Sequence, residues 1–303
     1  MIRHHQRTEY TVLNTAVLGT GLLALDLVER IQHSPHLHCE LVIGRTAQSN
    51  GMAQAGAMGC ATAAGGIAAL DDAGEDFDIV FDVTNAFAHP AHWAQLAGTG
   101  ATLIDLTPTS GGTLIVPAVN GGRAAAHRHI GLITCGGQAS IPILHAVAQH
   151  YRPRHVEMVA TAASRSVGRA SRLNLDEYID ATQSAIQHFT HATTTKTMLN
   201  ISPASPPPPF RTAMTIVATA LEQGPVRDLV ESVAATMQSF VPGYRLISCT
   251  VTDDTLRAVV EVTATRGGMP THAGNLEVIS AAAIHAAEQH ALARTPAVKE
   301  IAR

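Results

Sequence analysis

One cysteine of the sequence stands where a thiol can act as a nucleophile. Cys135 follows a strand-like run, residues 132–134, and precedes two glycines and a helix that the pattern begins at about Ser140. The amides and the dipole at a helix N-terminus favour the thiolate, which is the reactive form of cysteine. The glycines leave room for a carbonyl group, and nearby amides can stabilise an oxyanion. We therefore predict that Cys135 is the catalytic nucleophile.

A glycine-rich turn near the start of the chain fits the dinucleotide-binding pattern G-x-G-x-x-G/A. In residues 19–24, GTGLLA, Gly19 permits a tight turn, Gly21 lets the backbone approach a pyrophosphate, and Ala24 allows close packing of helix on strand. The turn follows a strand-like run and precedes a helical pattern, whose N-terminus would face the phosphates. A glycine turn without a ligand is the alternative. The residues predicted to contact the dinucleotide here are Gly19, Thr20, Gly21, Leu22 and Leu23.

The end of the second strand bears on the choice between NAD and NADP. An acidic residue there would bind the ribose 2′-hydroxyl of NAD, but the strand ends Gly44-Arg45-Thr46. Arg45 can meet a 2′-phosphate, assisted by Thr46 or Ser49, while a solvent-facing arginine is the alternative. We predict that either NAD or NADP is the cofactor and that NADP(H) is accepted.

A thiol beside a nicotinamide ring implies one type of chemistry. The thiolate adds to an aldehyde, hydride passes to NAD(P)⁺, and the thioester that remains is resolved by an external acceptor. Such chemistry requires a crevice that brings Cys135 and the glycine-rich turn together.

The elements along the chain predict such a crevice in an α/β fold. Strand-like and helical patterns alternate up to Cys135, which predicts a Rossmann dinucleotide-binding domain over residues 1–134. Residues 135–270 read as an α+β catalytic and dimerisation domain, and the proline-rich run at 202–209 reads as an extended crossover loop. An alanine-rich helix within residues 271–303 is expected to return to the first domain.

Composition excludes several classes of function. The 303 residues carry a net charge of −4, which argues against nucleic-acid binding, and no run of about 18 apolar residues predicts a membrane span. The N-terminal MIRHHQRTEY lacks the apolar segment of a signal peptide, and four scattered cysteines suit a reducing compartment, so a cytoplasmic location is expected. Cys39, Cys60 and Cys249 are expected to be structural. The 17 histidines show no metal-site spacing, and no metal is expected.

Several blocks resemble a known family in family order. FDIVFDVTNAFAH, LIDLTP, VPAVN, TCGGQASIP, SRSVGRASRLNLDEY, VPGYRL and AGNLEVISAAA are similar to blocks of the acylating, CoA-dependent acetaldehyde dehydrogenases of aromatic meta-cleavage pathways, over nearly the whole chain. The resemblance implies a thioacyl intermediate on Cys135, coenzyme A as co-substrate, a homodimer and a 4-hydroxy-2-oxovalerate aldolase as partner. It also implies cofactor contacts from Ser166, Val167, Gly168, Arg169, Ala170, Ser171, Arg172, Leu173, Asn174 and Asn275.

Departures from the family pattern imply a divergent member. GTGLLA replaces the usual GSGNIG, Arg45 replaces an acidic residue, and Arg169-Ala170-Ser171 replaces PGT. Thr212 follows Arg211 where the family has an aspartate that assists the thiol, and threonine cannot act as a general base.

Two other functions remain open at this point. A phosphorylating semialdehyde dehydrogenase shares the domain plan and resolves the thioester with phosphate. A non-catalytic, nucleotide-binding partner subunit would explain the altered turn and Thr212, although the intact TCGGQ block around Cys135 argues against it.

Overall fold

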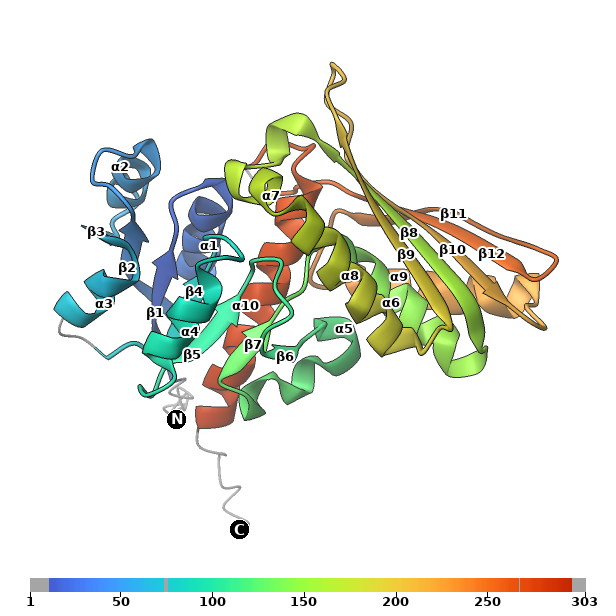
Figure 1. Ribbon diagram of the computed structural model, residues 1–303, viewed down its shortest axis with the longest axis horizontal. Helices are drawn as coiled ribbons and strands as arrows, with labels where there is room; N and C mark the ends of the chain where they lie inside the picture. The colour runs from blue at the N-terminus through green and yellow to red at the C-terminus, as the bar shows by residue number, and fades with distance from the viewer. Residues whose placement is uncertain (1–10, 74–75, 267, 296–303) are drawn as a thin grey trace, which may run out of the picture.

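Seven parallel strands form the first of two sheets (Figure 1). The structure is a computed structural model, and it describes residues 11–73, 76–266 and 268–295. The strand order is β3-β2-β1-β4-β5-β7-β6. The chain adds strands toward one edge up to β3 and then toward the other edge from β4, and a Rossmann sheet binds its ligand at this switch point between β1 and β4. The strands are β1 (Leu13–Leu18), β2 (Leu37–Gly44), β3 (Ala61–Ala64), β4 (Ile79–Asp82), β5 (Thr102–Asp105), β6 (Thr113–Leu114) and β7 (His129–Gly131).

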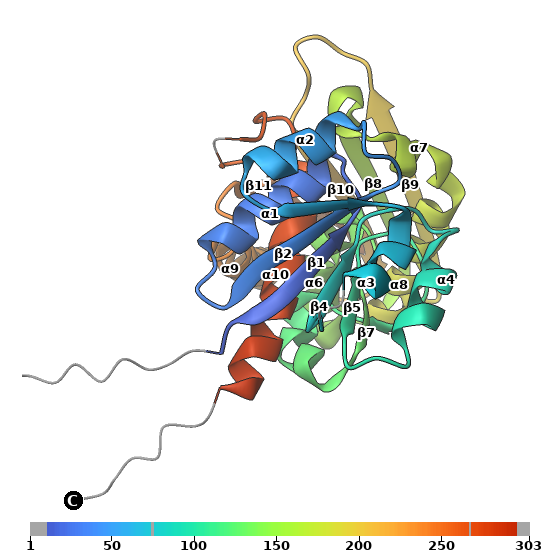
Figure 2. The same cartoon turned by 90° about the vertical axis from the view of Figure 1, so that its left-hand side faces the viewer.

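Helices cover both faces of this sheet, as the buried strands β4 and β5 require (Figure 2). One face packs on α1 and α10, and the other packs on α3 and α4. The helical segments of this part are α1 (Leu22–His33), α2 (Asn50–Ala57), η1 (Gly66–Ala68), α3 (Ala69–Asp72), α4 (His89–Leu96), α5 (Pro117–Asn120) and η2 (Gly121–Ala126).

The second sheet is mixed and has the order β11-β12-β10-β8-β9. Its pairs are antiparallel except β8 with β9, and α6, α8 and α9 cover one face, where their apolar sides form a single core with the strands. The elements are α6 (Cys135–His150), β8 (Pro153–Ala163), η3 (Ser164–Ser166), α7 (Arg169–Leu173), α8 (Leu175–Thr190), β9 (Thr194–Ser202), β10 (Phe210–Ala218), α9 (Gln223–Gln238), β11 (Tyr244–Thr252) and β12 (Thr255–Val262).

The other face of the second sheet is left uncovered by the described residues. Along β10 buried residues alternate with exposed or half-buried ones, so every second side chain points away from the helices. The proline-rich run predicted as a loop joins β9 to β10 and extends away from the body of the molecule (Figure 1).

A long helix, α10 (Gly274–Arg294), lies between the two sheets. It contacts α1, β2 and β5 on one side and α6 and β12 on the other. Gly274 is required where the helix starts, because a Cβ there would lie 1.8 Å from the carbonyl oxygen of Val262. Inside the protein, the Arg30 guanidinium of α1 pairs with Asp26 at 2.9 Å and with Glu277 of α10 at 2.9 Å. The α/β fold class, a Rossmann-like sheet with a second mixed sheet, is confirmed.

Candidate active site

Cys135 is the first residue of α6 and lies on a strained turn. The helix begins five residues earlier than predicted, because the Thr134 side chain caps it by accepting a hydrogen bond from the Gly137 amide at 3.0 Å. Gly136 and Gly137 are therefore helical, although the sequence predicts them in the turn before the helix. Ile133, buried and β-branched, has a φ of 66°, a conformation that costs about 1–3 kcal/mol. Ile133 lies two residues before Cys135, which is partly exposed at the start of the helix.

Among the described residues, Tyr178 of α8 is the one whose side chain forms a hydrogen bond with this thiol. Its hydroxyl oxygen lies 3.6 Å from Cys135 Sγ and accepts a hydrogen bond from the Gly136 amide at 3.1 Å. The oxygen accepts from this amide, and the phenolic hydrogen remains available to the sulfur. Burial raises the pKa of Tyr178 well above its usual value, so the residue stays protonated and keeps a hydrogen to donate.

The electrostatics of the thiol differ from the sequence-based expectation. Burial raises the pKa of Cys135 to about 11, although the Tyr178 hydroxyl and the Gly136 amide lower it. Burial outweighs the predicted stabilisation by amides: the Gly136 amide lowers the pKa of Cys135 but also bonds Tyr178, and the Gly137 amide bonds Thr134. The free protein therefore holds a thiol at neutral pH, and Tyr178 is the side chain that favours its ionisation.

The pH dependence of Cys135 alkylation should reveal the raised pKa of the thiol and the contribution of Tyr178 to it. With iodoacetamide, we expect a rate that rises roughly tenfold per pH unit from pH 7 to about 10, since only the thiolate reacts. In Tyr178→Phe the profile should shift to higher pH, because the group that lowers the pKa of Cys135 is lost. Mass spectrometry of the labelled peptide measures the rate. A midpoint near neutral pH, or no shift in Tyr178→Phe, would contradict this account.

Thr212 is buried in β10 on the side of the sheet that faces α6. It pairs with Ala160, whose Cβ lies 3.3 Å from the position of a Cβ on Gly136. Its hydroxyl has no hydrogen-bond partner among the described residues. The position that carries an aspartate in the resembled family thus lies close to the nucleophile, and here it supplies no base.

The glycine-rich turn is packed tightly at Gly19 and is open at Gly21. Gly19 has a φ of +129°, and a Cβ there would lie 2.6 Å from Val83 of the neighbouring strand end. Gly21 is the N-cap of α1 and has open space around it. Leu22 is exposed and Leu23 half-buried, and Gly51 packs against the Thr20 carbonyl, where a Cβ would lie 1.8 Å from the oxygen.

Arg45 is exposed directly after β2, at the carboxyl edge where the ribose of a dinucleotide would lie. Ser49, predicted to assist it, is instead used within the fold. Its hydroxyl caps α2 by accepting from the Met52 amide at 3.1 Å and donates to Thr20 at 3.3 Å. Of the two predicted helpers, only Thr46 is exposed beside Arg45.

The two segments that the resemblance assigned to the nicotinamide lie together. Asn275, the second residue of α10, donates from Nδ2 to the Ser166 carbonyl at 3.0 Å, so it is not a helix N-cap. Asn174 accepts from the Ala86 amide at 3.2 Å. Asn174 Nδ2 and Asn275 Oδ1 are buried and have no hydrogen-bond partner among the described residues. One orphaned donor and one orphaned acceptor suit a carboxamide, which carries both groups.

The rest of this segment forms the short helix α7 and its cap. Gly168 is the N-cap, and Val167 is buried. The Arg172 guanidinium bonds the Ser164 carbonyl and hydroxyl at 2.9 Å each and the Val167 carbonyl at 3.2 Å, so it is engaged locally. Of the other predicted contact residues, Arg169, Ser171 and Leu173 are exposed and Ala170 is half-buried.

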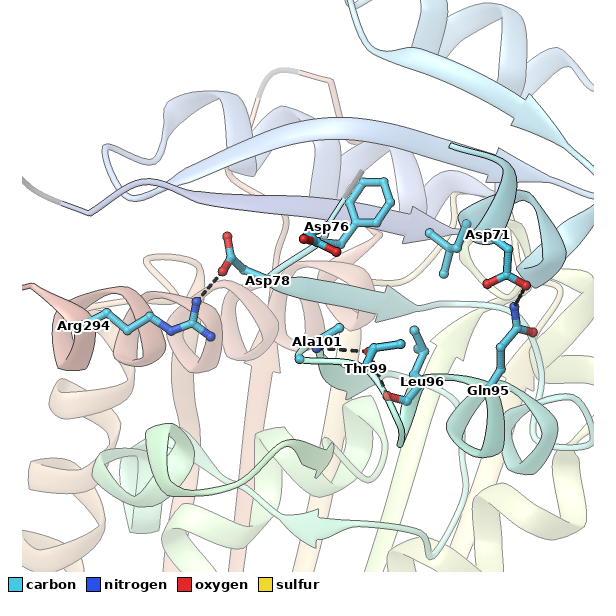
Figure 3. A pocket seen from close by; sticks show the side chains of 11 residues that line it. Asp71, Asp76, Asp78, Gln95, Leu96, Thr99, Ala101 and Arg294 are labelled. Atoms are coloured by element: carbon cyan, nitrogen blue, oxygen red, sulfur yellow. Dashed lines mark hydrogen bonds and ion pairs between the residues drawn. The ribbon is translucent and has the colours of Figure 1, made fainter. Parts of the chain in front are cut away.

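A separate hollow of about 640 Å³ lies at the opposite edge of the first sheet (Figure 3). It lies where β4 and β5 begin, and Asp78 there pairs with Arg294 of α10. Gln95 donates to Asp71 at 2.8 Å across its other end. Open α/β sheets bind ligands at the carboxyl ends of their strands, so this hollow is not the dinucleotide site.

Comparison with known proteins identifies the family. A family model described as prokaryotic acetaldehyde dehydrogenase, dimerisation, matches residues 135–270. An acetaldehyde dehydrogenase of Streptomyces griseus is 45% identical over 276 residues, covering 91% of this chain and 89% of that protein. Acetaldehyde dehydrogenase 2 of Salinispora arenicola is 39% identical over 285 residues, covering 93% and 97%. The chain belongs to the acetaldehyde dehydrogenase family.

Membership in this family makes the chain an aldehyde dehydrogenase, an oxidoreductase, as the resemblance predicted. The fold is shared more widely. The crystal structure of aspartate semialdehyde dehydrogenase II from Vibrio cholerae, complexed with ASA, superposes with a TM-score of 0.63 at 13% identity, covering 92% of this chain and 98% of that one. No helix of the described residues is long and apolar enough to cross a membrane.

Proposed function

We propose that the protein is a CoA-acylating aldehyde dehydrogenase that forms a thioester on Cys135. The observation that carries the proposal is the partly exposed thiol at the start of α6, with a protonated Tyr178 hydroxyl 3.6 Å away. Its family relatives are named for acetaldehyde, so a short-chain aldehyde or acyl-CoA is the proposed substrate.

The residues of the site perform most of the proposed reaction. Cys135 loses its proton to solvent, and Tyr178 stabilises the resulting thiolate by donating its hydroxyl hydrogen. The sulfur attacks the aldehyde carbon, which gives a thiohemiacetal oxyanion near the same donor. A bound nicotinamide dinucleotide supplies the hydride acceptor. Loss of hydride leaves a thioester on Cys135, which the thiol of coenzyme A cleaves to give acyl-CoA and the free cysteine.

The dinucleotide is proposed to span the carboxyl edge of the first sheet. Gly19 and Gly21 would bind the pyrophosphate at the start of α1, and Arg45 would lie beside the adenine ribose. The unpaired amide atoms of Asn174 and Asn275 would hold the nicotinamide carboxamide. This set fits NAD or NADP, and the exposed cation of Arg45 favours acceptance of NADP.

A homodimer is the proposed assembly. The dimerisation model matches the residues that build the second sheet, and no described helix covers one face of that sheet. An aldolase that supplies the aldehyde, as the family resemblance implies, is the proposed second partner.

The acceptor of the acyl group tests the proposed function. With acetaldehyde and NAD⁺ or NADP⁺, reduction of the dinucleotide should require coenzyme A and should yield acetyl-CoA by mass spectrometry. Phosphate in place of coenzyme A should give no acyl phosphate. Acyl phosphate without acyl-CoA would identify a phosphorylating semialdehyde dehydrogenase. No turnover of several acyl-CoAs with NADH or NADPH would identify a non-catalytic subunit.

The side chain at position 45 should control cofactor preference. In Arg45→Asp we expect kcat/KM for NADP(H) to fall by a factor of about 10–100, because a carboxylate replaces the cation beside the 2′-phosphate. The value for NAD(H) should rise or stay unchanged. Arg123→Asp, at an exposed arginine of η2, is the matched control and should change neither value. Equal kinetics of wild type and Arg45→Asp with NADPH would refute a role for Arg45.

A further inference from the structure

Two carboxylates and an imidazole meet inside the first sheet, away from the thiol. Asp82 and Asp105 end β4 and β5 and are register partners in the parallel pair. His89, the first residue of α4, lies over both. Asp82 and Asp105 are 0% exposed and His89 is 2% exposed. Buried carboxylates need positive charge beside them, and a bound cation can supply it.

The two nitrogen–oxygen distances of this cluster match the spacing of ligands around an ion. His89 Nδ1 lies 3.3 Å from Asp82 Oδ2 and 3.3 Å from Asp105 Oδ2, which is long for a charge-assisted hydrogen bond. His92 shows a normal bond in the same place, with its Nδ1 2.7 Å from Asp82 Oδ2. Two ligands of a tetrahedral ion with bonds of about 2.0–2.1 Å lie roughly 3.3–3.4 Å apart. We propose that Asp82, His89 and Asp105 bind a divalent cation of the zinc class.

Each of the three ligands is oriented by a further group. Asp82 Oδ1 accepts from the Thr84 amide at 3.0 Å and from its hydroxyl at 2.6 Å. Asp105 Oδ1 accepts from the Thr107 amide at 2.7 Å. His89 Nε2 lies 2.9 Å from His129 Nε2, so the second ring nitrogen is held and Nδ1 is left to face the carboxylates. Outer contacts of this kind on every ligand are typical of metal sites.

His129, whose ring nitrogen lies beside His89, also lines an open hollow. Its ring stacks on Trp93 with centroids 4.2 Å apart, and both side chains line an open hollow of about 370 Å³ together with His127. Three protein ligands leave one position of a four-coordinate ion for water or for an imidazole from this side.

The cation would tie together the ends of two strands and the start of a helix. The segment between Asp82 and His89 carries Ala86, whose amide binds Asn174. Bound metal would thus fix the backbone that supports one of the proposed nicotinamide contacts. Metal binding itself does not depend on the proposed thioester chemistry, since no ligand is shared with Cys135.

Cobalt(II) is the probe for this site. We expect the full chain, freed of metal with a chelator, to bind one equivalent of Co²⁺ with the intense visible absorption of a four-coordinate ion, which Zn²⁺ then displaces. At a Zn²⁺ concentration about 100 times its Kd, the melting temperature should rise by about 5 °C. Cys135→Ala should give the same spectrum, which excludes the thiol as a ligand.

Variants distinguish Co²⁺ binding at this site from Co²⁺ binding by other histidines. His89→Gln and the near-isosteric Asp105→Asn should each lose the absorption band, and His129→Gln should bind Co²⁺ about 10–100-fold more weakly. His145→Gln, at a histidine bonded to the Phe189 carbonyl, is the matched control and should bind normally. A wild type without the band would overturn the proposal, since His89 would then bridge the carboxylates as a protonated imidazole. An unchanged band in folded Asp105→Asn would also overturn it.

Discussion

Cys135→Ala is expected to lower kcat/KM for aldehyde and dinucleotide by a factor on the order of 10³ or more. Nucleophilic catalysis ends when the sulfur is removed, and the described residues around it offer only Tyr178, a donor, in its place. The helix start should be preserved, because Thr134 caps it through its own side chain. Coupled measurements of NADH formation and of circular dichroism separate loss of chemistry from loss of fold.

Cys249→Ala is the matched control for this variant. Cys249 is buried in β11 of the second sheet, so its replacement should cost stability but leave kcat/KM within about threefold. Wild-type protein mixed with acetyl-CoA and then quenched should carry an acetyl group on Cys135, and Cys135→Ala should carry none. Activity in Cys135→Ala, or acylation of another residue, would remove the basis of the proposed mechanism.

Gly136→Ala is expected to destabilise the protein by about 1–3 kcal/mol, although alanine normally stabilises a helix interior. A Cβ at this position would lie 2.4 Å from the Tyr178 hydroxyl oxygen and 3.0 Å from Met158. The backbone there is helical, so only the contact can cause the loss. The displaced hydroxyl should also lower activity, because the same oxygen lies beside the sulfur.

A double-mutant cycle tests the contact directly. Removing the hydroxyl in Tyr178→Phe should recover about 1–2 kcal/mol of the stability lost in Gly136→Ala, measured by urea denaturation. Gly224→Ala is the control, since that helical glycine has open space around it and alanine should be neutral or stabilising. Strictly additive effects of the two substitutions would show that the hydroxyl does not approach Gly136.

The fold followed from local patterns in the sequence. Alternating strand and helix signals predicted the first sheet, and the glycine turn predicted at residues 19–24 joins β1 to α1 and has close contacts to Val83. The start of α6 was misplaced, because two glycines resemble a loop unless the Thr134 cap is recognised. Thr134 is an N-cap residue type directly before the helix, and that signal was present.

Contacts between residues that are far apart in the chain could not be predicted from local sequence patterns. Tyr178 lies 43 positions from Cys135, and an apolar-facing tyrosine in an amphipathic helix reads as core. Asp82, His89 and Asp105 come from two strand ends and a helix, a spacing that matches no metal motif. The thiol pKa was also misjudged, since a helix N-terminus favours the thiolate but burial outweighs it, and burial is not a local property.

The ion pairs of Arg30 constrain how the enzyme moves during turnover. α1 begins at the proposed phosphate end of the crevice, and α10 begins at its nicotinamide end. Because Arg30 of α1 pairs with Glu277 of α10 in the interior, the two helices are held together there. We expect admission and release of substrates to use local rearrangement of loops rather than separation of these two helices.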